Sequence, residues 1–153
     1  MKNFLNSFNN RWSNKILLRI MAIVALVGVV DTIYLTVNYY FGTGVQCLLL
    51  EGCEVVLTSQ YSEILSIPLA VLGLVFYAGI FVLVNWYDIY QERYLLKWIV
   101  AAGTVGFIAS LVFLHIQLFM LRALCFYCLT SLTFSTLLFL LATILFNQNK
   151  IKI

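Results

Sequence analysis

The cysteines are the residues of this chain whose type and spacing indicate chemistry. Cys125 and Cys128 form a CxxC pair in "ALCFYCLTSL", and Cys47 and Cys53 enclose the segment "CLLLEGC". Residues three apart lie on one face of a helix, and the unpaired N–H groups and the dipole at a helix start favour a thiolate. The spacing therefore predicts thiol–disulfide exchange, with Cys125 as the cysteine of lower pKa and Cys128 about one turn deeper.

Other uses of the four cysteines compete with this interpretation. Two cysteine pairs can supply the tetrahedral ligands of structural zinc, but "CLLLEGC" is spaced more widely than a zinc knuckle, so no metal site is expected. Two inert disulfides in a four-span scaffold protein are the stronger alternative, although a CxxC pair closes a ring too small to stabilise a fold much. A transporter or metal-binding membrane protein that uses Asp31, His115 and the cysteines is a third class.

The composition is that of an integral membrane protein. The chain is 63% hydrophobic and 10% charged, and its mean hydropathy is +1.02, whereas soluble domains are about 45–50% apolar and about 25% charged. With a single proline and no low-complexity stretch, the chain offers no linker, so residues 1–153 are interpreted as one domain. The net charge of +3 follows from membrane topology and is not taken as a nucleic-acid-binding surface.

Four segments are apolar over the roughly 20 residues that a membrane-spanning helix needs. The predicted fold is an all-α membrane protein, a bundle of four transmembrane helices. The spans are expected at about residues 16–39, 67–86, 96–121 and 125–146, with a long outer loop at about residues 40–66. Within that loop, "CEVVLTSQYSEIL" mixes apolar and polar residues in the way that predicts a short helix on the membrane surface.

The positions of the cations predict the orientation of this bundle, because short loops rich in Lys and Arg stay in the cytoplasm. Cations occur near both termini and between the second and third spans, whereas the long loop has none. Both termini are therefore expected to be cytoplasmic, which puts all four cysteines on the outer side. Thiols are readily oxidised outside a bacterial membrane and in the lumen of the endoplasmic reticulum. We favour a bacterial or archaeal plasma membrane over the endoplasmic reticulum membrane.

An ordered set of motifs resembles a known family. An outer-loop cysteine pair precedes "SQYSEILSIPLAVLGLVFY", and "CFYCLTS" opens the last span. Together with "DTIYLT" in the first span, this order resembles the vitamin K epoxide reductase family, in its prokaryotic disulfide-forming branch. The bacterial disulfide-bond B family, another group of four-helix thiol oxidases linked to quinones, has the reverse order, with its CxxC in the first outer loop. Some members carry a fused thioredoxin-like domain after the fourth span, which this chain lacks, so a separate partner is expected.

The resemblance implies a thiol relay that ends at a membrane quinone of the ubiquinone, menaquinone or vitamin K type. Cys47 would meet a thioredoxin-fold disulfide carrier protein, Cys53 would exchange with Cys125, and Cys128 would face the quinone in a pocket surrounded by membrane lipid. The net reaction would oxidise the partner dithiol and reduce quinone to quinol, which supports disulfide formation in exported proteins. Vertebrate members place an asparagine and a tyrosine where this chain has Leu69 and Leu132, so plain quinone is expected as substrate rather than vitamin K epoxide.

The polar residues within the spans are candidates for the quinone pocket. Asp31 lies deep in the first span, where a carboxyl group is costly enough to suggest a function, although a protonated structural carboxyl is an equal alternative. Gly73 and Tyr77 match the family pattern, and Ser131 lies one turn below Cys128. His115 and Gln117 are two residues apart and cannot share a helix face, so at most one of them is expected to face the pocket. A further serine, Ser135, is expected to pack helices together.

Overall fold

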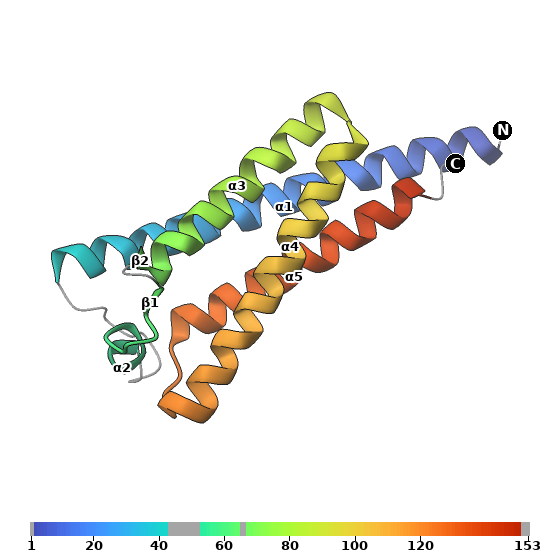
Figure 1. The fold of residues 1–153 in the computed structure, drawn as a ribbon. Coiled ribbons are helices and arrows are strands. Elements are labelled where there is room, and N and C mark those ends of the chain that lie inside the picture. The colour runs from blue at the N-terminus through green and yellow to red at the C-terminus, as the bar shows by residue number, and fades with distance from the viewer. Residues whose placement is uncertain (1, 43–52, 65–66, 151–153) are drawn as a thin grey trace.

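The computed structural model describes residues 2–42, 53–64 and 67–150. Long helices make up most of this part of the chain, and a π-helical segment, η1, continues directly from α4 (Figure 1). The helices and this segment are α1 (Lys2–Phe41), α3 (Leu69–Tyr90), α4 (Arg93–His115), η1 (Ile116–Leu121) and α5 (Phe126–Lys150).

The four predicted transmembrane helices are confirmed as helices long and apolar enough to cross a membrane. These segments are Asn14–Phe41, Leu69–Tyr90, Arg93–Leu121 and Phe126–Asn149. Among the ends of these apolar segments, the largest difference from the prediction is at α3, which was expected to stop near residue 86 and continues to Tyr90. Backbone hydrogen bonding carries that helix past the apolar run, until Gln91 adopts a left-handed conformation with φ 54°.

The bundle consists of two closely packed helix pairs. The most extensive contacts are those of α1 with α3 and of α4 with α5, and smaller contacts join the pairs through α1 with α5 and through α3 with α4. We call the end where α1 begins, α5 ends and α3 connects to α4 the terminal end. The opposite end, which holds the end of α1, η1 and the start of α5, is the loop end (Figure 1).

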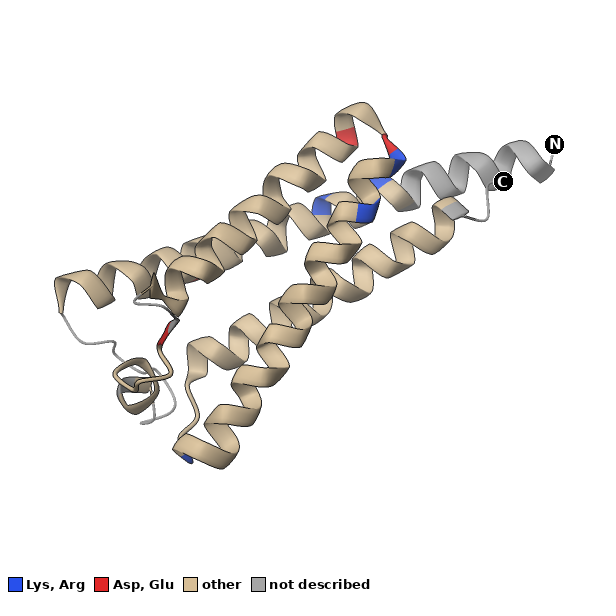
Figure 2. Ribbon diagram, viewed as in Figure 1, with Lys and Arg blue, Asp and Glu red and all other residues tan. Residues whose placement is uncertain are grey.

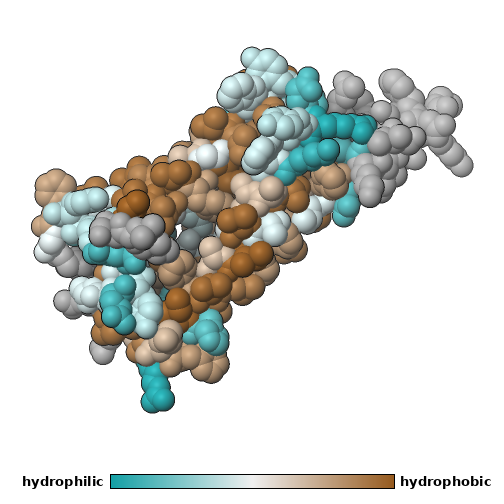
Figure 3. All heavy atoms as spheres, in the orientation of Figure 1, coloured by the Kyte–Doolittle hydropathy of each residue, from teal (hydrophilic) through white to brown (hydrophobic). Residues whose placement is uncertain are grey.

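The apolar core fills the bundle toward the terminal end. Buried residues follow helical spacing along each helix, such as Leu18, Met21 and Ala25 on α1. Their counterparts on the other helices are Ile80, Val84, Leu96, Ile99, Leu138, Ala142 and Leu145. Many other apolar side chains face outward, and Figure 3 shows them as a broad hydrophobic band with hydrophilic residues gathered toward the two ends. This inverted exterior suits lipid as the surrounding solvent.

Charged residues are distributed unevenly between the two ends (Figure 2). Among the side chains that the structure describes, Lys15, Arg19, Arg93 and Lys97 lie toward the terminal end, and Arg122 lies at the connection from η1 to α5. This separation matches the charge pattern from which the orientation was predicted. Which end faces the cytoplasm stays a prediction.

Short elements close the loop end. The helix α2 (Cys53–Leu57) is followed by turns, and the strand β1 (Glu63–Ile64) pairs antiparallel with β2 (Ile67–Pro68). The predicted short helix of the outer loop is therefore only five residues long, and its position on the membrane surface stays a prediction. A hydrogen bond from the Tyr39 hydroxyl to the Glu63 carboxylate ties this hairpin to the end of α1.

Candidate redox site

The CxxC pair lies at the start of α5. The Leu129 N–H donates to the Cys125 carbonyl at 3.1 Å, which is the first helical hydrogen bond and makes Cys125 the N-cap residue. Cys125 and Cys128 are both free thiols. A hydrogen bond from the Cys128 thiol, helped by the backbone N–H groups of Cys128 and Tyr127, lowers the pKa of Cys125 from 9.0 to about 7, although burial opposes this shift. The first turn of the helix therefore favours a thiolate at Cys125, as its position in the sequence predicts.

The loop cysteine Cys53 lies against this pair. Cys53 begins α2, is disulfide-bonded, and is fully buried, as is Cys125. The two belong to one buried cluster with Val56, and Leu57, Leu121 and Cys128 pack around it. The structure thus brings together three of the four cysteines that the sequence singled out. The fourth, Cys47, lies outside the described residues.

Gln117 supports the CxxC pair from the neighbouring segment η1. Its side chain is only 3% exposed, and its Oε1 accepts a hydrogen bond from the Cys125 N–H at 3.0 Å. Its carbonyl accepts the Ala123 N–H at 3.2 Å, and Arg122 makes the turn with φ 49°. His115 instead is exposed, and its ring packs against that of Phe119 with the centroids 4.6 Å apart and the planes tilted by 33°. Gln117 is therefore the member of this pair of residues that faces the site.

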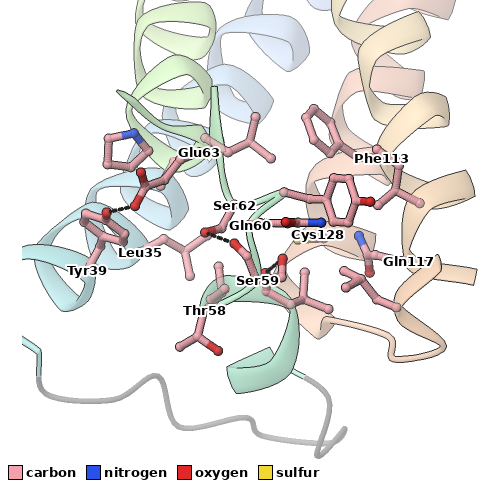
Figure 4. Close-up of a pocket in the computed structure, with 18 of the residues that line it drawn as sticks. Leu35, Tyr39, Thr58, Ser59, Gln60, Ser62, Glu63, Phe113, Gln117 and Cys128 are labelled. Atoms are coloured by element: carbon pink, nitrogen blue, oxygen red, sulfur yellow. Dashed lines mark hydrogen bonds between the residues drawn. The ribbon is translucent and has the colours of Figure 1, made fainter. Parts of the chain in front are cut away.

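Two cavities meet at Cys128. The deep cavity has a volume of about 330 Å³ and lies among α1, α3, α4 and α5. The outer cavity has a volume of about 740 Å³ and is lined by many polar residues of the loop end, such as Ser59, Ser62 and Glu63 (Figure 4). Cys128 and Gln117 line both cavities. Cys128 thus borders both a chamber with many polar lining residues and a more apolar one, and Figure 3 shows a hollow in the hydrophobic band.

All of the residues predicted for the quinone pocket line the deep cavity, namely Asp31, Gly73, Tyr77, Cys128 and Ser131. Most of the other lining residues are apolar. Ligand sites are commonly apolar cavities of about 300–1,000 Å³ with a few polar groups. The structure brings the five residues together, whereas their roles stay predictions.

The polar groups of the deep cavity differ in how they are paired. The Tyr77 hydroxyl donates to the Ser131 carbonyl at 3.0 Å and shares a hydrogen bond with the Ser131 hydroxyl at 2.8 Å. The Tyr77 ring packs so closely on α1 that a Cβ added at Gly28 would lie 2.5 Å from a ring carbon. The Oδ2 atom of Asp31, in contrast, is buried and has no hydrogen-bond partner among the residues that the structure describes. Asp31 therefore brings an unsatisfied polar atom to the lining of this cavity.

Comparison with protein families decides what kind of protein carries this site. Residues 19–143 match the model of the vitamin K epoxide reductase family. The chain belongs to the vitamin K epoxide reductase family. A search of curated proteins gave no match.

Membership of the vitamin K epoxide reductase family supports an oxidoreductase activity in a membrane, of the kind that couples thiols to quinones. Within this family member, helix packing around the site also depends on serines. The Ser135 hydroxyl on α5 donates to the Ser110 hydroxyl on α4 at 2.8 Å. This contact confirms the expectation that Ser135 joins helices.

Proposed function

We propose that the protein is a membrane thiol:quinone oxidoreductase that oxidises a thioredoxin-fold partner through two cysteine pairs and reduces a membrane quinone. The single observation that carries the proposal is the position of Cys125 and Cys128. Cys125 packs against the disulfide-bonded Cys53, and Cys128 lines an apolar cavity among the helices. A series of neighbouring cysteines of this kind connects an aqueous surface with the membrane interior.

The relay consists of successive thiol–disulfide exchanges. The partner dithiol reduces the loop disulfide formed by Cys47 and Cys53 and becomes a disulfide. The loop dithiol then reduces the Cys125–Cys128 disulfide, and the loop disulfide forms again. Finally the Cys125–Cys128 dithiol returns to the disulfide and releases two electrons and two protons. A quinone bound in the deep cavity supplies the acceptor for these electrons and protons.

The residues of the deep cavity fit such a group. Its walls are largely apolar, as a quinone ring with a lipid tail requires, and the Asp31 Oδ2, which has no partner among the described residues, offers one polar contact. We assign to Asp31 the supply of a proton to an oxygen atom in the cavity. Tyr77 and Ser131 hold α3 and α5 together through their mutual hydrogen bonds, so their part is to fix the shape of the cavity.

The lining of the cavity also bears on the choice between plain quinone and vitamin K epoxide. Leu69 and Leu132 both line the deep cavity. Neither side chain offers a hydrogen bond to an epoxide or a carbonyl oxygen at these two positions. The lining therefore favours plain quinone as substrate.

The partner and the compartment follow from the same proposal. The partner is a separate thioredoxin-fold disulfide carrier whose cysteines attack the loop disulfide from the outer side of a bacterial or archaeal plasma membrane. The alternative of a scaffold with two inert disulfides is weakened because Cys125 and Cys128 are free. It is further weakened because Cys128 borders two cavities.

Substitution of single cysteines tests the proposal. We expect Cys128→Ser to abolish quinone reduction by the purified protein and Cys47→Ser to stop reduction by the partner while a small dithiol still serves as donor. Mass spectrometry of Cys128→Ser should detect a trapped Cys53–Cys125 disulfide. Full quinone turnover by Cys128→Ser would refute the relay.

A further inference from the structure

We infer that Gln117 is a catalytic residue that holds the sulfur atom leaving the CxxC pair. One end of its side-chain amide is fixed by the Cys125 backbone, and the other end donates a hydrogen bond to the Cys128 sulfur when the disulfide opens. This inference rests on the proposed function and adds to it a residue outside the four cysteines. It concerns the exchange between Cys53 and Cys125.

The hydrogen bonds determine which way the amide points. The Cys125 backbone N–H is a donor, so the atom 3.0 Å from it must be the side-chain oxygen of Gln117. The NH₂ group then lies at the other end of the amide. Gln117 and Cys128 line the same two cavities, and in Figure 4 the Gln117 side chain extends from η1 toward Cys128 at the edge of the outer cavity. One amide is thus fixed by the Cys125 backbone and directed toward the Cys128 sulfur.

The burial of Gln117 gives the hydrogen bonds of its amide a large energetic effect. Gln117 is 3% exposed, and a buried N–H group without an acceptor costs about 1–3 kcal/mol. A sulfur atom is a weak acceptor as a thiol and a strong one as a thiolate, because hydrogen bonds to ionised groups are about twice as strong as neutral ones. The amide therefore interacts best with Cys128 when that sulfur carries negative charge.

Negative charge reaches Cys128 at a defined step. The Cys53 thiolate attacks the Cys125 sulfur, the Cys53–Cys125 bond forms, and the Cys125–Cys128 bond breaks. The electron pair of the broken bond goes to the Cys128 sulfur as a thiolate, so the charge passes from Cys53 to Cys128 and no proton is transferred. The rate of such an exchange rises as the leaving thiolate is stabilised. Gln117 donates to this leaving group.

The π-helical turn explains how Gln117 reaches this position. Residues Ile116–Leu121 continue α4 with wider π-helical winding, and such segments are frequent at functional sites. The changed winding directs Gln117 toward the start of α5, while His115, the last residue of α4, faces outward. The position of the amide is therefore a property of this segment.

Two substitutions separate the N–H donor of the amide from its oxygen acceptor. Gln117→Leu removes both groups, whereas Gln117→Glu keeps an oxygen for the Cys125 N–H and, at a pH at which the carboxyl group is ionised, offers no donor to Cys128. We expect both to slow the opening of the Cys125–Cys128 disulfide by about 10- to 100-fold, as expected for the loss of a hydrogen bond to a charged group. The measurement is the single-turnover rate of mixed-disulfide formation after reduction of the loop pair. Gln148→Leu, the same change at the other end of α5, is the control.

The Glu variant makes the inference falsifiable even where the Leu variant folds poorly. If Gln117 only caps α5, Gln117→Glu will open the disulfide at the wild-type rate, and the inference is wrong. If the amide serves the leaving sulfur, Gln117→Glu will be slow while its thermal unfolding in detergent stays close to that of the wild type.

A second measurement needs neither quinone nor partner. The background is Cys125→Ser, in which Cys128 is the only cysteine of the pair. The measured quantity is the pH at which a small methanethiosulfonate reagent labels Cys128 at half its maximal rate. Gln117→Leu should raise this pH by about one unit, which corresponds to a tenfold loss of thiolate. An unchanged midpoint would overturn the inference and leave the proposed function standing. Full quinone turnover by Cys128→Ser would instead refute the proposed function. Even then, a raised labelling midpoint in Gln117→Leu would still establish the contact between Gln117 and the Cys128 thiolate.

Discussion

The two ends of the bundle differ in how their interior is filled. Toward the terminal end, large apolar side chains such as Met21, Ile80 and Ile99 are fully or almost fully buried and pack in one cluster. At the loop end, the interior holds sulfur atoms, a buried amide and two cavities. The comparison shows that packing and chemistry are separated along the axis of the bundle, so that one end stabilises the fold while the other has room for reactants.

The arrangement of the helix pairs explains this difference. The short connection at Gln91 and Glu92 holds α3 and α4 together at the terminal end, and the two helices diverge toward the loop end (Figure 1). The α1–α3 pair and the α4–α5 pair therefore enclose space at the loop end. The deep cavity occupies part of that space and is lined from all four helices.

The largest effect on stability is expected from removing a packed side chain at the terminal end. Ile99 is fully buried, and Ile99→Ala should lower the free energy of unfolding by about 2–3 kcal/mol. This is the lower part of the usual range, because lipid is as apolar as the core and only packing is lost. Unfolding in detergent measures the loss, with Ile108→Ala on the lipid-facing side of α4 as the control. A change in the labelling rate of Cys125 would show that the two ends are not independent.

A smaller effect that reaches both ends is expected at Gly28. An alanine Cβ there would lie 2.5 Å from the Tyr77 ring, so the ring must move and its hydrogen bonds to Ser131 must weaken. Gly28→Ala should cost about 1–3 kcal/mol of stability and lower quinone turnover.

The matched control for Gly28→Ala is Gly79→Ala, where an added Cβ meets nothing within 4 Å. This change should leave turnover unaltered. Equal turnover of the two alanine variants would show that the Tyr77–Ser131 contact does not shape the cavity.

Asp31 should show opposite effects on stability and activity. Its Oδ2 is buried without a partner among the described residues, so Asp31→Leu should raise the stability by about 1 kcal/mol while lowering quinone turnover. Stabilisation with loss of activity is the usual sign of a polar group retained for function. Thermal unfolding and turnover are compared with those of Asp88→Leu, an exposed position at the terminal end. Unchanged quinone turnover in Asp31→Leu would show that Asp31 has only a structural role.

The smallest expected effect is the pH dependence of the alkylation rate of Cys125. Its pKa of about 7 predicts that alkylation reaches half its maximal rate near pH 7 and falls at lower pH. The folded-state pKa lies below the ordinary thiol value of 9.0, so the stability contributed by this thiolate is fully present above about pH 9 and is lost as the pH falls through about 7.

Because the largest cause of the low pKa is the hydrogen bond from the Cys128 thiol, Cys128→Ala should raise the midpoint of Cys125 alkylation. The shift should be incomplete, since the backbone N–H groups of α5 remain. An unaltered midpoint in Cys128→Ala would mean that the backbone N–H groups alone lower this pKa.

Some features of the site were predictable from residue types and others were not. Asp31, Gly73, Tyr77 and Ser131 were chosen from their positions in the apolar spans and from the family resemblance, and all four line one cavity. Sequence spacing left open whether His115 or Gln117 faces the site, because a regular helix places them on different faces without saying which one faces inward. Nothing in the sequence marked the π-helical turn that settles this point.

The sequence by itself determined the four spans and the chemistry at the start of the last one. Long apolar runs, the positions of the cations and the CxxC spacing are local properties, and each acts through the solvent or through neighbouring residues on one helix. Only the tertiary structure decided that Cys53 packs against Cys125, that Gln117 contacts the pair, and that Cys128 borders two cavities. These relations depend on how two helix pairs and a short loop element pack across long separations in sequence, which no local pattern encodes.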